Sequence, residues 1–344
     1  MILIRLLAML MVLGSSAAAM EPGGITADEW TAYKQQFLRS EGRIVDNGNG
    51  GISHSEGQGY GLLIAYLAKS PADFERIWHF TRTEMLLRDD GLVAWKWEEK
   101  ASPHVTDVNN ATDGDILIAY ALGLAGAEWA RPDYVEAARG LADSLLKVAA
   151  VRDQDRLLLL PGAVGFSRTD REDGPVVNLS YWIYEAFPVL DRLRPGPEWA
   201  RLAADGRALL GQSLFSTSHL PPDWISVRRG PRPAKGFPFQ FGYNAVRIPL
   251  YLMRAGVEDE NLLRTLRDGM ASGGGIGVVD LAGGIVREQL GDPGYRIIQA
   301  AASCILDRTP IDKALLTFQP VLYYPSTLHL LMLSYLRKEA PECL

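Results

Sequence analysis

Cysteine and histidine are scarce in this sequence of 344 residues, which has two of the first and five of the second. It contains no HExxH, CxxC, GxSxG, Walker or complete GxGxxG motif, which argues against the common zinc, redox, serine-hydrolase and nucleotide sites. Four residues faintly resemble a calcium loop: Asp107, Asn109, Asp113 and Asp115. Thr112, however, occupies the position where that loop requires glycine. No metal and no cofactor is therefore predicted.

An excess of positive charge is also missing. The chain has 35 Lys and Arg against 41 Asp and Glu, for a net charge of -6. Proteins that bind nucleic acid derive much of their affinity from neutralising phosphates, so neither nucleic acid nor an anionic membrane is a predicted partner. A content of 47% hydrophobic and 22% charged residues is typical of a globular protein. A chain of this length buries a large core without a metal or disulfide framework.

One apolar run stands apart, at the N-terminus. Arg5 is followed by apolar residues from Leu6 to Leu13 and then by small residues that end in three alanines, the pattern of a secretory signal peptide. The run is too short to span a bilayer. We therefore expect residues 1–19 to be a signal peptide, residues 20–344 to form a single domain, and the mature protein to be exported to the periplasm or secreted.

The two cysteines would then lie in an oxidising compartment. Cys304 falls in an apolar run, and Cys343 is the next-to-last residue, where chain ends commonly fray. A disulfide between them is therefore not predicted.

Helical periodicity covers nearly the whole chain after Thr26 and comes in two kinds. Amphipathic segments, which pack one face, are 26–38, 71–87, 133–148, 197–213, 258–271 and, more weakly, 312–318. Segments that are apolar nearly all round, and so must be buried, are 58–68, 115–127, 180–190, 245–255, 294–306 and 326–337. Their alternation predicts an all-α fold, an (α/α)6 barrel of six inner and six outer helices. The Pro- and Gly-rich stretches 193–197, 229–238 and 272–293 are predicted loops over the barrel mouth, with a small β-hairpin as an option.

Polar residues gather where the first four apolar helices begin, in residues 54–61, 109–115, 178–182 and 242–247. If the helices form a ring, these segments converge on one concave face, which is the usual place for a ligand. The simpler interpretation is helix capping by Ser55, Thr112, Asp113 and Asn244.

Carboxylates, amides and aromatic rings are the groups that remain, and they suit a sugar ligand. Carboxylates act as acid and base on a glycosidic bond, and flat rings cover the C–H faces of sugars. The candidate aromatic platforms are Trp95, Trp97, Trp224, Tyr60, Tyr181 and Tyr243. Trp97 and Trp224 lie beside polar loops and are the first choices, although a single tryptophan is more often a core residue.

Residues 111–125 (ATDGDILIAYALGLA) and 55–61 (SEGQGYG) closely resemble the signature and the acid motif of glycoside hydrolase family 8. The resemblance extends over the mature chain, including 161–162, 178–181, 221–224 and 323–324. It is greatest to exported endo-β-1,4-glucanases associated with bacterial cellulose synthesis. The resemblance implies an (α/α)6 barrel that hydrolyses β-1,4-glucan, as cellulose or soluble derivatives, with inversion. A cellulose synthase machinery is an optional further partner, although contact with it does not follow from the sequence.

The same resemblance assigns roles to individual residues. It makes Glu56 the general acid and Asp113 the group that binds the sugar at the cleavage point. We expect burial and the charge of Asp113 to raise the pKa of Glu56. The remaining candidate substrate contacts are Tyr60, Trp97, Asn110, Tyr181, Trp224, Tyr243 and Arg247.

One position departs from the family pattern. Asn244 stands where many members carry the Asp that serves as general base, and a neutral amide cannot accept a proton from water. Asp223 is the first alternative base and Asp113 the second. If no other carboxylate serves as base, three explanations remain. Asn244 only positions water and turnover is slow, the protein binds glucan without hydrolysing it, or Asn244 is an introduced change.

Other substrates within the family stay open. Xylan and mixed-linkage glucan are alternatives to cellulose. Chitosan is disfavoured, because a site for a cationic sugar would carry extra acids, whereas the nearby loop carries Arg228, Arg229, Arg232 and Lys235.

Overall fold

The computed structural model describes residues 24–271 and 276–344. The expected signal peptide at residues 1–19 lies outside the described residues. Within the described ranges, no helix is both long and apolar enough to cross a membrane.

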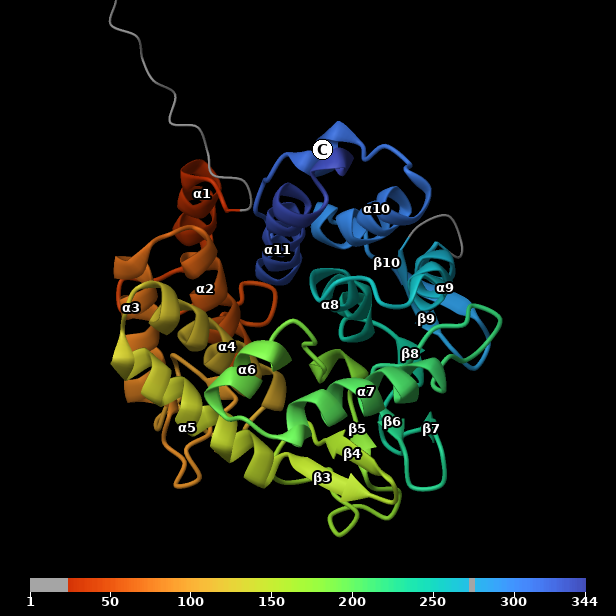
Figure 1. Cartoon of the computed structure of the whole chain (residues 1–344), viewed down its shortest axis with the longest axis horizontal. Coiled ribbons are helices and arrows are strands. Elements are labelled where there is room, and N and C mark those ends of the chain that lie inside the picture. The colour runs from red at the N-terminus through yellow and green to blue at the C-terminus, as the bar shows by residue number, and fades with distance from the viewer. Residues whose placement is uncertain (1–23, 272–275) are drawn as a thin grey trace, which may run out of the picture.

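Six helical segments form an inner ring (Figure 1). They are α2 (Ser55–Leu67), α4 (Thr112–Glu128), α6 (Phe187–Leu193), α8 (Ile248–Arg254), α10 (Pro293–Asp307) and α11 (Tyr323–Glu339). Contacts run from α2 to α4 to α6, from α8 to α10 to α11, and from α11 back to α2. The remaining gap is bridged by two 3-10 turns that precede α6 and α8, η2 (Leu179–Tyr181) and η3 (Ala245–Arg247).

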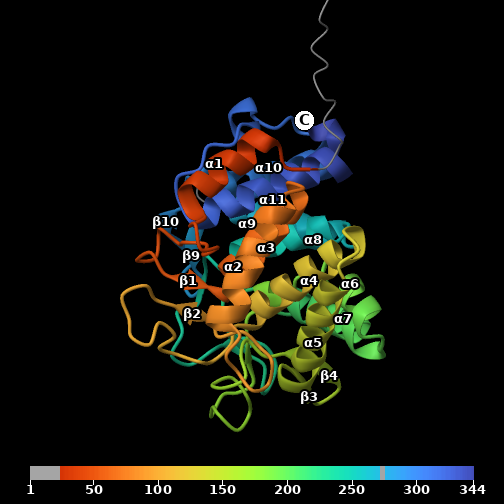
Figure 2. The same ribbon diagram turned by 90° about the vertical axis from the view of Figure 1, so that its left-hand side faces the viewer.

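The outer helices pack against this ring (Figure 2). They are α1 (Ala27–Phe37), α3 (Pro71–Phe80), α5 (Pro132–Val148), α7 (Pro197–Gly211) and α9 (Glu260–Met270). α3 continues into one π-helical turn, η1 (Thr81–Met85), and the sixth outer element is only a 3-10 turn, η4 (Lys313–Leu316). The predicted (α/α)6 barrel is confirmed, with the weak periodicity at 312–318 corresponding to this short turn.

Glycines allow α2 and α4 to approach closely at their N-terminal ends. A Cβ atom on Gly114 would lie 2.2 Å from Oγ of Ser55, and one on Gly59 would lie 2.5 Å from Cβ of Leu117. Only residues without a side chain fit this crossing. The close approach places the first turns of the two helices, and therefore Glu56 and Asp113, side by side.

Short strands occupy the loops between helices. The pairs are β1 (Ser53–His54) with β2 (Lys96–Trp97), and β3 (Ala150–Asp153) with β4 (Arg156–Leu159). Three-stranded sheets are formed by β5 (Val176–Val177), β6 (Ile225–Ser226) and β7 (Arg232–Pro233), and by β8 (Gln240–Phe241), β9 (Gly277–Asp280) and β10 (Ile285–Gln289). The β9–β10 hairpin lies in the predicted loop 272–293. The stretch 193–197 was wrongly placed at the mouth, because it joins the C-terminal end of α6 to α7.

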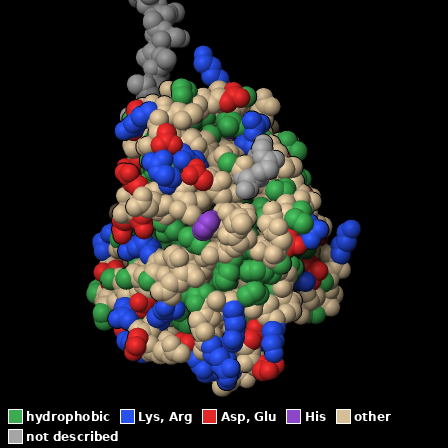
Figure 3. All heavy atoms as spheres, turned by 90° about the vertical axis from the view of Figure 1, so that its right-hand side faces the viewer, with side chains coloured by type: hydrophobic (Ala, Val, Ile, Leu, Met, Phe, Trp, Pro, Cys, Tyr) green, Lys and Arg blue, Asp and Glu red, His purple; other side chains and the backbone are tan. Residues whose placement is uncertain are grey.

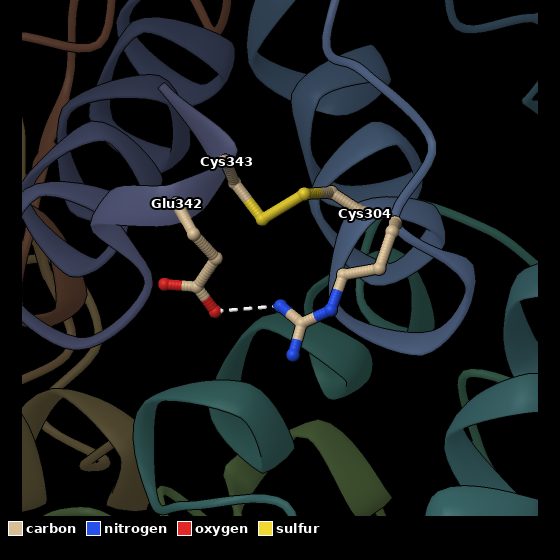
Figure 4. Close-up of a disulfide and its surroundings, with 4 residues drawn as sticks. Cys304, Glu342 and Cys343 are labelled. Atoms are coloured by element: carbon tan, nitrogen blue, oxygen red, sulfur yellow. Dashed lines mark hydrogen bonds and ion pairs between the residues drawn. A yellow bond between two sulfur atoms is a disulfide. The ribbon is translucent and has the colours of Figure 1, made fainter.

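A disulfide joins Cys304 in α10 to Cys343 near the C-terminus (Figure 4). The sequence left this disulfide possible but did not lead us to expect it, and that expectation is wrong. It assumed a frayed chain end, whereas the end forms a 3-10 turn, η5 (Pro341–Cys343), that packs on α10 and buries Cys343. Beside the disulfide, Arg308 Nη1 donates to Glu342 Oε1 at 2.8 Å.

Candidate active site

A cavity of about 720 Å³ lies where the inner helical segments begin. Each of the six contributes at or just before its N-terminal end, and the loops after Val45 and before Lys96 complete the wall. The lining residues are Asp46, Gly48, Asn49, His54, Ser55, Glu56, Trp95, Ala111, Asp113, Tyr181, Tyr243, Asn244, Tyr295, Leu322, Tyr324 and Pro325. The predicted convergence of the four polar segments on one concave face is confirmed.

Capping does not explain these polar residues. His54, not Ser55, caps α2, and Oγ of Ser55 has no hydrogen-bond partner among the described residues. The hydroxyl of Thr112 donates to the carbonyl of Leu160, and the side chain of Asn244 makes no capping bond. The capping interpretation is therefore wrong for Ser55, Thr112 and Asn244, which leaves two of them, Ser55 and Asn244, in the cavity wall.

Arg247 is the centre of the charged groups in the site. Its guanidinium is fully buried, with Nη1 2.6 Å from Oε2 of Glu56 and Nη2 2.7 Å from Oδ2 of Asp113. Nη1 also lies 3.4 Å from the hydroxyl of Tyr60, which is itself hydrogen-bonded to the hydroxyl of Tyr251. One cation thus holds the two carboxylates of α2 and α4 together.

The two carboxyl groups have different proton affinities. Burial and the neighbouring charge of Glu56 raise the pKa of Asp113 to about 7, although Arg247 acts in the opposite direction. Burial also raises the pKa of Glu56, but the positive charge of Arg247 outweighs it and leaves that pKa below its usual value. The expectation of a raised pKa for Glu56 is therefore wrong for the ligand-free protein, since it did not include the ion pair with Arg247.

The tryptophans of the site differ from the prediction. Trp97 is buried against Phe80 and His104, with the Arg43 guanidinium 4.9 Å from its ring, and it does not line the cavity. Trp95, two residues earlier, does line the cavity, and its Nε1 donates to Asp107 at 2.8 Å. The sequence separates these two tryptophans poorly because both lie beside the same polar loop.

Trp224 is half-buried beside the cavity rather than in its wall. Its ring stacks on Phe166 and Phe237, with centroid distances of 5.6 and 4.6 Å. It also meets the ring of Tyr181, which lines the cavity, at 6.3 Å. Trp224 therefore supports an aromatic wall residue.

Of three other predicted substrate contacts, one faces the cavity, one lies on its rim and one lies behind its wall. The ring of Tyr181 faces the site, 5.6 Å from the Arg247 guanidinium. Tyr243 is exposed on the rim. Asn110 is buried behind the wall, where its Nδ2 donates to Asp115 at 2.9 Å and its Oδ1 accepts from the N–H of Ala163 at 2.7 Å.

Asn244 lines the cavity, whereas Asp223 lies behind it. Oδ1 of Asp223 accepts from the backbone N–H groups of Gly242 and Ala245 at 3.1 and 2.8 Å. Burial raises the pKa of Asp223 despite these hydrogen bonds. In this conformation Asp223 fixes the backbone of the segment that carries Asn244 and Arg247.

Several wall residues were missed from the sequence. Asp46, His54, Tyr295 and Tyr324 belong to different loops and helices that only the closed ring brings together. The hydroxyl of Tyr324 donates to the carbonyl of Tyr243 at 2.7 Å, which ties α11 to the segment before η3. His54 is the first residue of the polar segment 54–61, and Tyr324 lies in the stretch 323–324, but neither was singled out as a site residue.

Comparison with known proteins identifies close relatives. The family model described as glycosyl hydrolases family 8 matches residues 3–268. A protein of Novacetimonas hansenii named as a probable endoglucanase is 37% identical over 310 residues, which are 88% of each chain. The solved structure of the endo-β-1,4-glucanase CMCax from Acetobacter xylinum matches with a TM-score of 0.79 at 34% identity, and covers 92% of this chain and 98% of that one. An endoglucanase structure from Klebsiella pneumoniae has the same TM-score at 31% identity, over 89% of this chain and 97% of that one.

Proposed function

Because this chain belongs to family 8 of the glycosyl hydrolases, we propose that it cleaves β-1,4-glucan at internal bonds, with inversion and with Glu56 as the general acid. The observation that carries this proposal is the Glu56–Arg247–Asp113 cluster at the edge of an open cavity. An acid-catalysed cleavage of a glycosidic bond requires a carboxylic acid that reaches the leaving oxygen.

The proton that the general acid donates is shared between the carboxyl groups of Glu56 and Asp113. In the ligand-free protein Asp113 has the higher pKa and is the first of the two to take up a proton. Sugar hydroxyls that donate hydrogen bonds to Asp113 favour its ionised form. Because two adjacent buried carboxylates repel each other, ionisation of Asp113 leaves the proton on Glu56, beside the scissile oxygen.

Activation of water requires a second carboxylate. Asp223 and Asp113 remain the candidates: Asp113 lines the cavity, and Asp223 lies directly behind the segment of Asn244. An inverting enzyme places its acid and base about 6.5–9.5 Å apart, with water between them. Use of Asp223 would require its buried carboxylate to gain access to water in the cavity, whereas Asp113 would have to leave Arg247.

A second candidate function follows from the presence of Asn244 in the cavity wall. If no other carboxylate serves as base, the protein binds β-glucan and turns it over slowly or not at all. Xylan and mixed-linkage glucan remain alternative substrates. Chitosan was disfavoured because of the basic loop at residues 228–235. Lys and Arg side chains do gather at the end of the molecule near β3, β4 and β7 (Figure 3), but none of them lines the cavity, so chitosan stays open as well.

Export is part of the proposal, with removal of residues 1–19 and a single catalytic domain from residue 20 onward. The disulfide supports it, since disulfides persist in oxidising compartments outside the cytosol. Contact with a cellulose synthase machinery rests on the resemblance alone.

The test is reducing-end release from carboxymethylcellulose by the protein and three variants. Glu56→Gln should abolish activity, since an amide cannot donate the catalytic proton. Loss of activity in a folded Asp223→Asn variant would make Asp223 the base. If the unchanged protein releases almost no reducing ends and Asn244→Asp restores their release, the result would instead support the glucan-binding function. Near-normal activity of Glu56→Gln would refute the assignment of the acid.

A further inference from the structure

His54 occupies a special position at the start of α2, two residues before Glu56. Its Nδ1 accepts a hydrogen bond from the backbone N–H of Gly57 at 3.0 Å, so the imidazole caps the helix. Its Nε2 lies 3.3 Å from Oδ2 of Asp46. Because Nδ1 must keep a lone pair to accept the first bond, the ring proton sits on Nε2 and is donated to Asp46.

The ring is held tightly. Its side chain is 15% exposed, and the ring of Tyr323 meets it edge-on with a centroid distance of 5.5 Å. A Cβ atom on Gly57 would lie 3.3 Å from Cε1 of the imidazole. The imidazole therefore has little freedom to turn while the cap is formed.

We propose that His54 is a positioning residue for the reaction. Its neutral ring fixes the first turn of α2 and so fixes the backbone from which Glu56 reaches the cavity, and protonation of the ring removes this support. The inference rests on the proposed role of Glu56.

The charges around the ring oppose its neutral form. Asp46 faces it from the loop after Val45, Glu56 from its own helix and Asp113 from α4, while the positive charge of Arg247 is paired with both of the last two. Burial lowers the pKa of His54, but the bond to Asp46 and the charges of Glu56 and Asp113 outweigh it and raise that pKa. A protonated Nδ1 would point its hydrogen at the N–H of Gly57, so the cap and the positive charge exclude each other.

Two substitutions distinguish the role of Nδ1 as a helix cap from the contact of Nε2 with Asp46. His54→Asn places an amide oxygen near the position of Nδ1 and can keep the cap, whereas His54→Gln reaches Asp46 but leaves the N–H of Gly57 without an acceptor. We expect His54→Gln to lower kcat on carboxymethylcellulose by at least about fivefold with little change in KM, a size in line with the loss of a helix cap. His54→Asn should recover most of that loss. The matched control is His219→Gln, an exposed histidine outside the cavity wall, which should leave kcat unchanged.

The second measurement is the ratio of kcat/KM at pH 6 to that at pH 9, because the pKa of His54 is raised above its usual value. Asn does not titrate, so this ratio should be higher in His54→Asn than in the parent. Equal kcat values for the Asn and Gln variants, or an unchanged ratio in His54→Asn, would refute the proposal, and the ratio stands as a test even if His54→Gln fails to fold. Failure of the proposed function is seen separately, as activity retained by Glu56→Gln.

Discussion

Arg247 is the residue whose loss should have the largest combined effect on stability and activity. Its replacement by Met leaves Glu56 and Asp113 buried side by side without a cation. Breaking a buried ion pair by removing one partner costs about 3–5 kcal/mol. For a chain of this length the entropy of unfolding is about 0.7 kcal/mol per degree, so Tm should fall by about 4–7 °C near neutral pH.

The loss should depend on pH in a defined direction. In the parent, Arg247 lowers the pKa of Glu56, so the stability from that contact is present above the unfolded pKa and is lost as the pH falls through the folded one. Without Arg247 both carboxyl groups take up protons more readily, and the variant recovers part of its deficit in acid. Calorimetric unfolding of both proteins from pH 4 to 8 measures this difference in Tm.

Arg254 provides a matched control. Its Nε lies 2.6 Å from Oε1 of Glu185, both side chains are 7% exposed, and neither lines the cavity. Arg254→Met should therefore lower Tm by a similar amount and retain kcat measured below its unfolding range, whereas Arg247→Met should lose activity. An unchanged Tm for Arg247→Met at pH 7, or a deficit that does not shrink in acid, would refute this reasoning.

Three further predictions concern other parts of the structure. Replacing Cys304 and Cys343 together by Ser opens a loop closed over 39 residues and should cost about 4 kcal/mol, seen as a Tm lower by about 6 °C; an unchanged Tm would contradict it. Gly114→Ala should destabilise the protein by about 1–3 kcal/mol and lower kcat, because the added Cβ would press on the first turn of α2. The control is Gly140→Ala, which has open space around it and should be neutral or stabilising by up to about 1 kcal/mol. Burial raises the pKa of Asp115 to about 7, above its unfolded value, so its protonated form stabilises the fold and stability should fall as pH rises from about 4 to 7. Asp115→Asn should flatten that part of a plot of Tm against pH, and an unchanged slope would argue against the assignment.

The fold was predictable because the spacing of apolar residues along a helix indicates how much of its surface is buried. The segment at 115–127 is apolar on every side and is a buried inner helix, α4, and the segment at 133–148 has one apolar stripe and is an outer helix, α5. The breaks in the inner segments at 180–190 and 245–255 were not predicted. There the chain forms a 3-10 turn before each short helix, and each short helix has proline as its second residue.

Apart from Trp95, the site was predictable where its residues lie at or just before the start of an inner helix. Glu56 and Asp113 belong to such positions, as does Tyr181 in the turn before α6. Asp46 comes from a loop with no helical pattern, and Tyr295 and Tyr324 begin helices from the other end of the chain. The error over Trp97 has a different cause, since sequence alone does not tell which of two nearby aromatic rings points outward.

The closure of the ring has a consequence for how the protein is made. The last inner helix, α11, completes the ring by packing on α2 and α1, and Tyr33 there hydrogen-bonds Thr327, 294 positions away. Arg337 and Glu29 form an ion pair across the same seam. A ribosome therefore has to complete α11 before the seam can close, and a nascent chain that stops before Tyr323 presents an open edge of apolar inner helices.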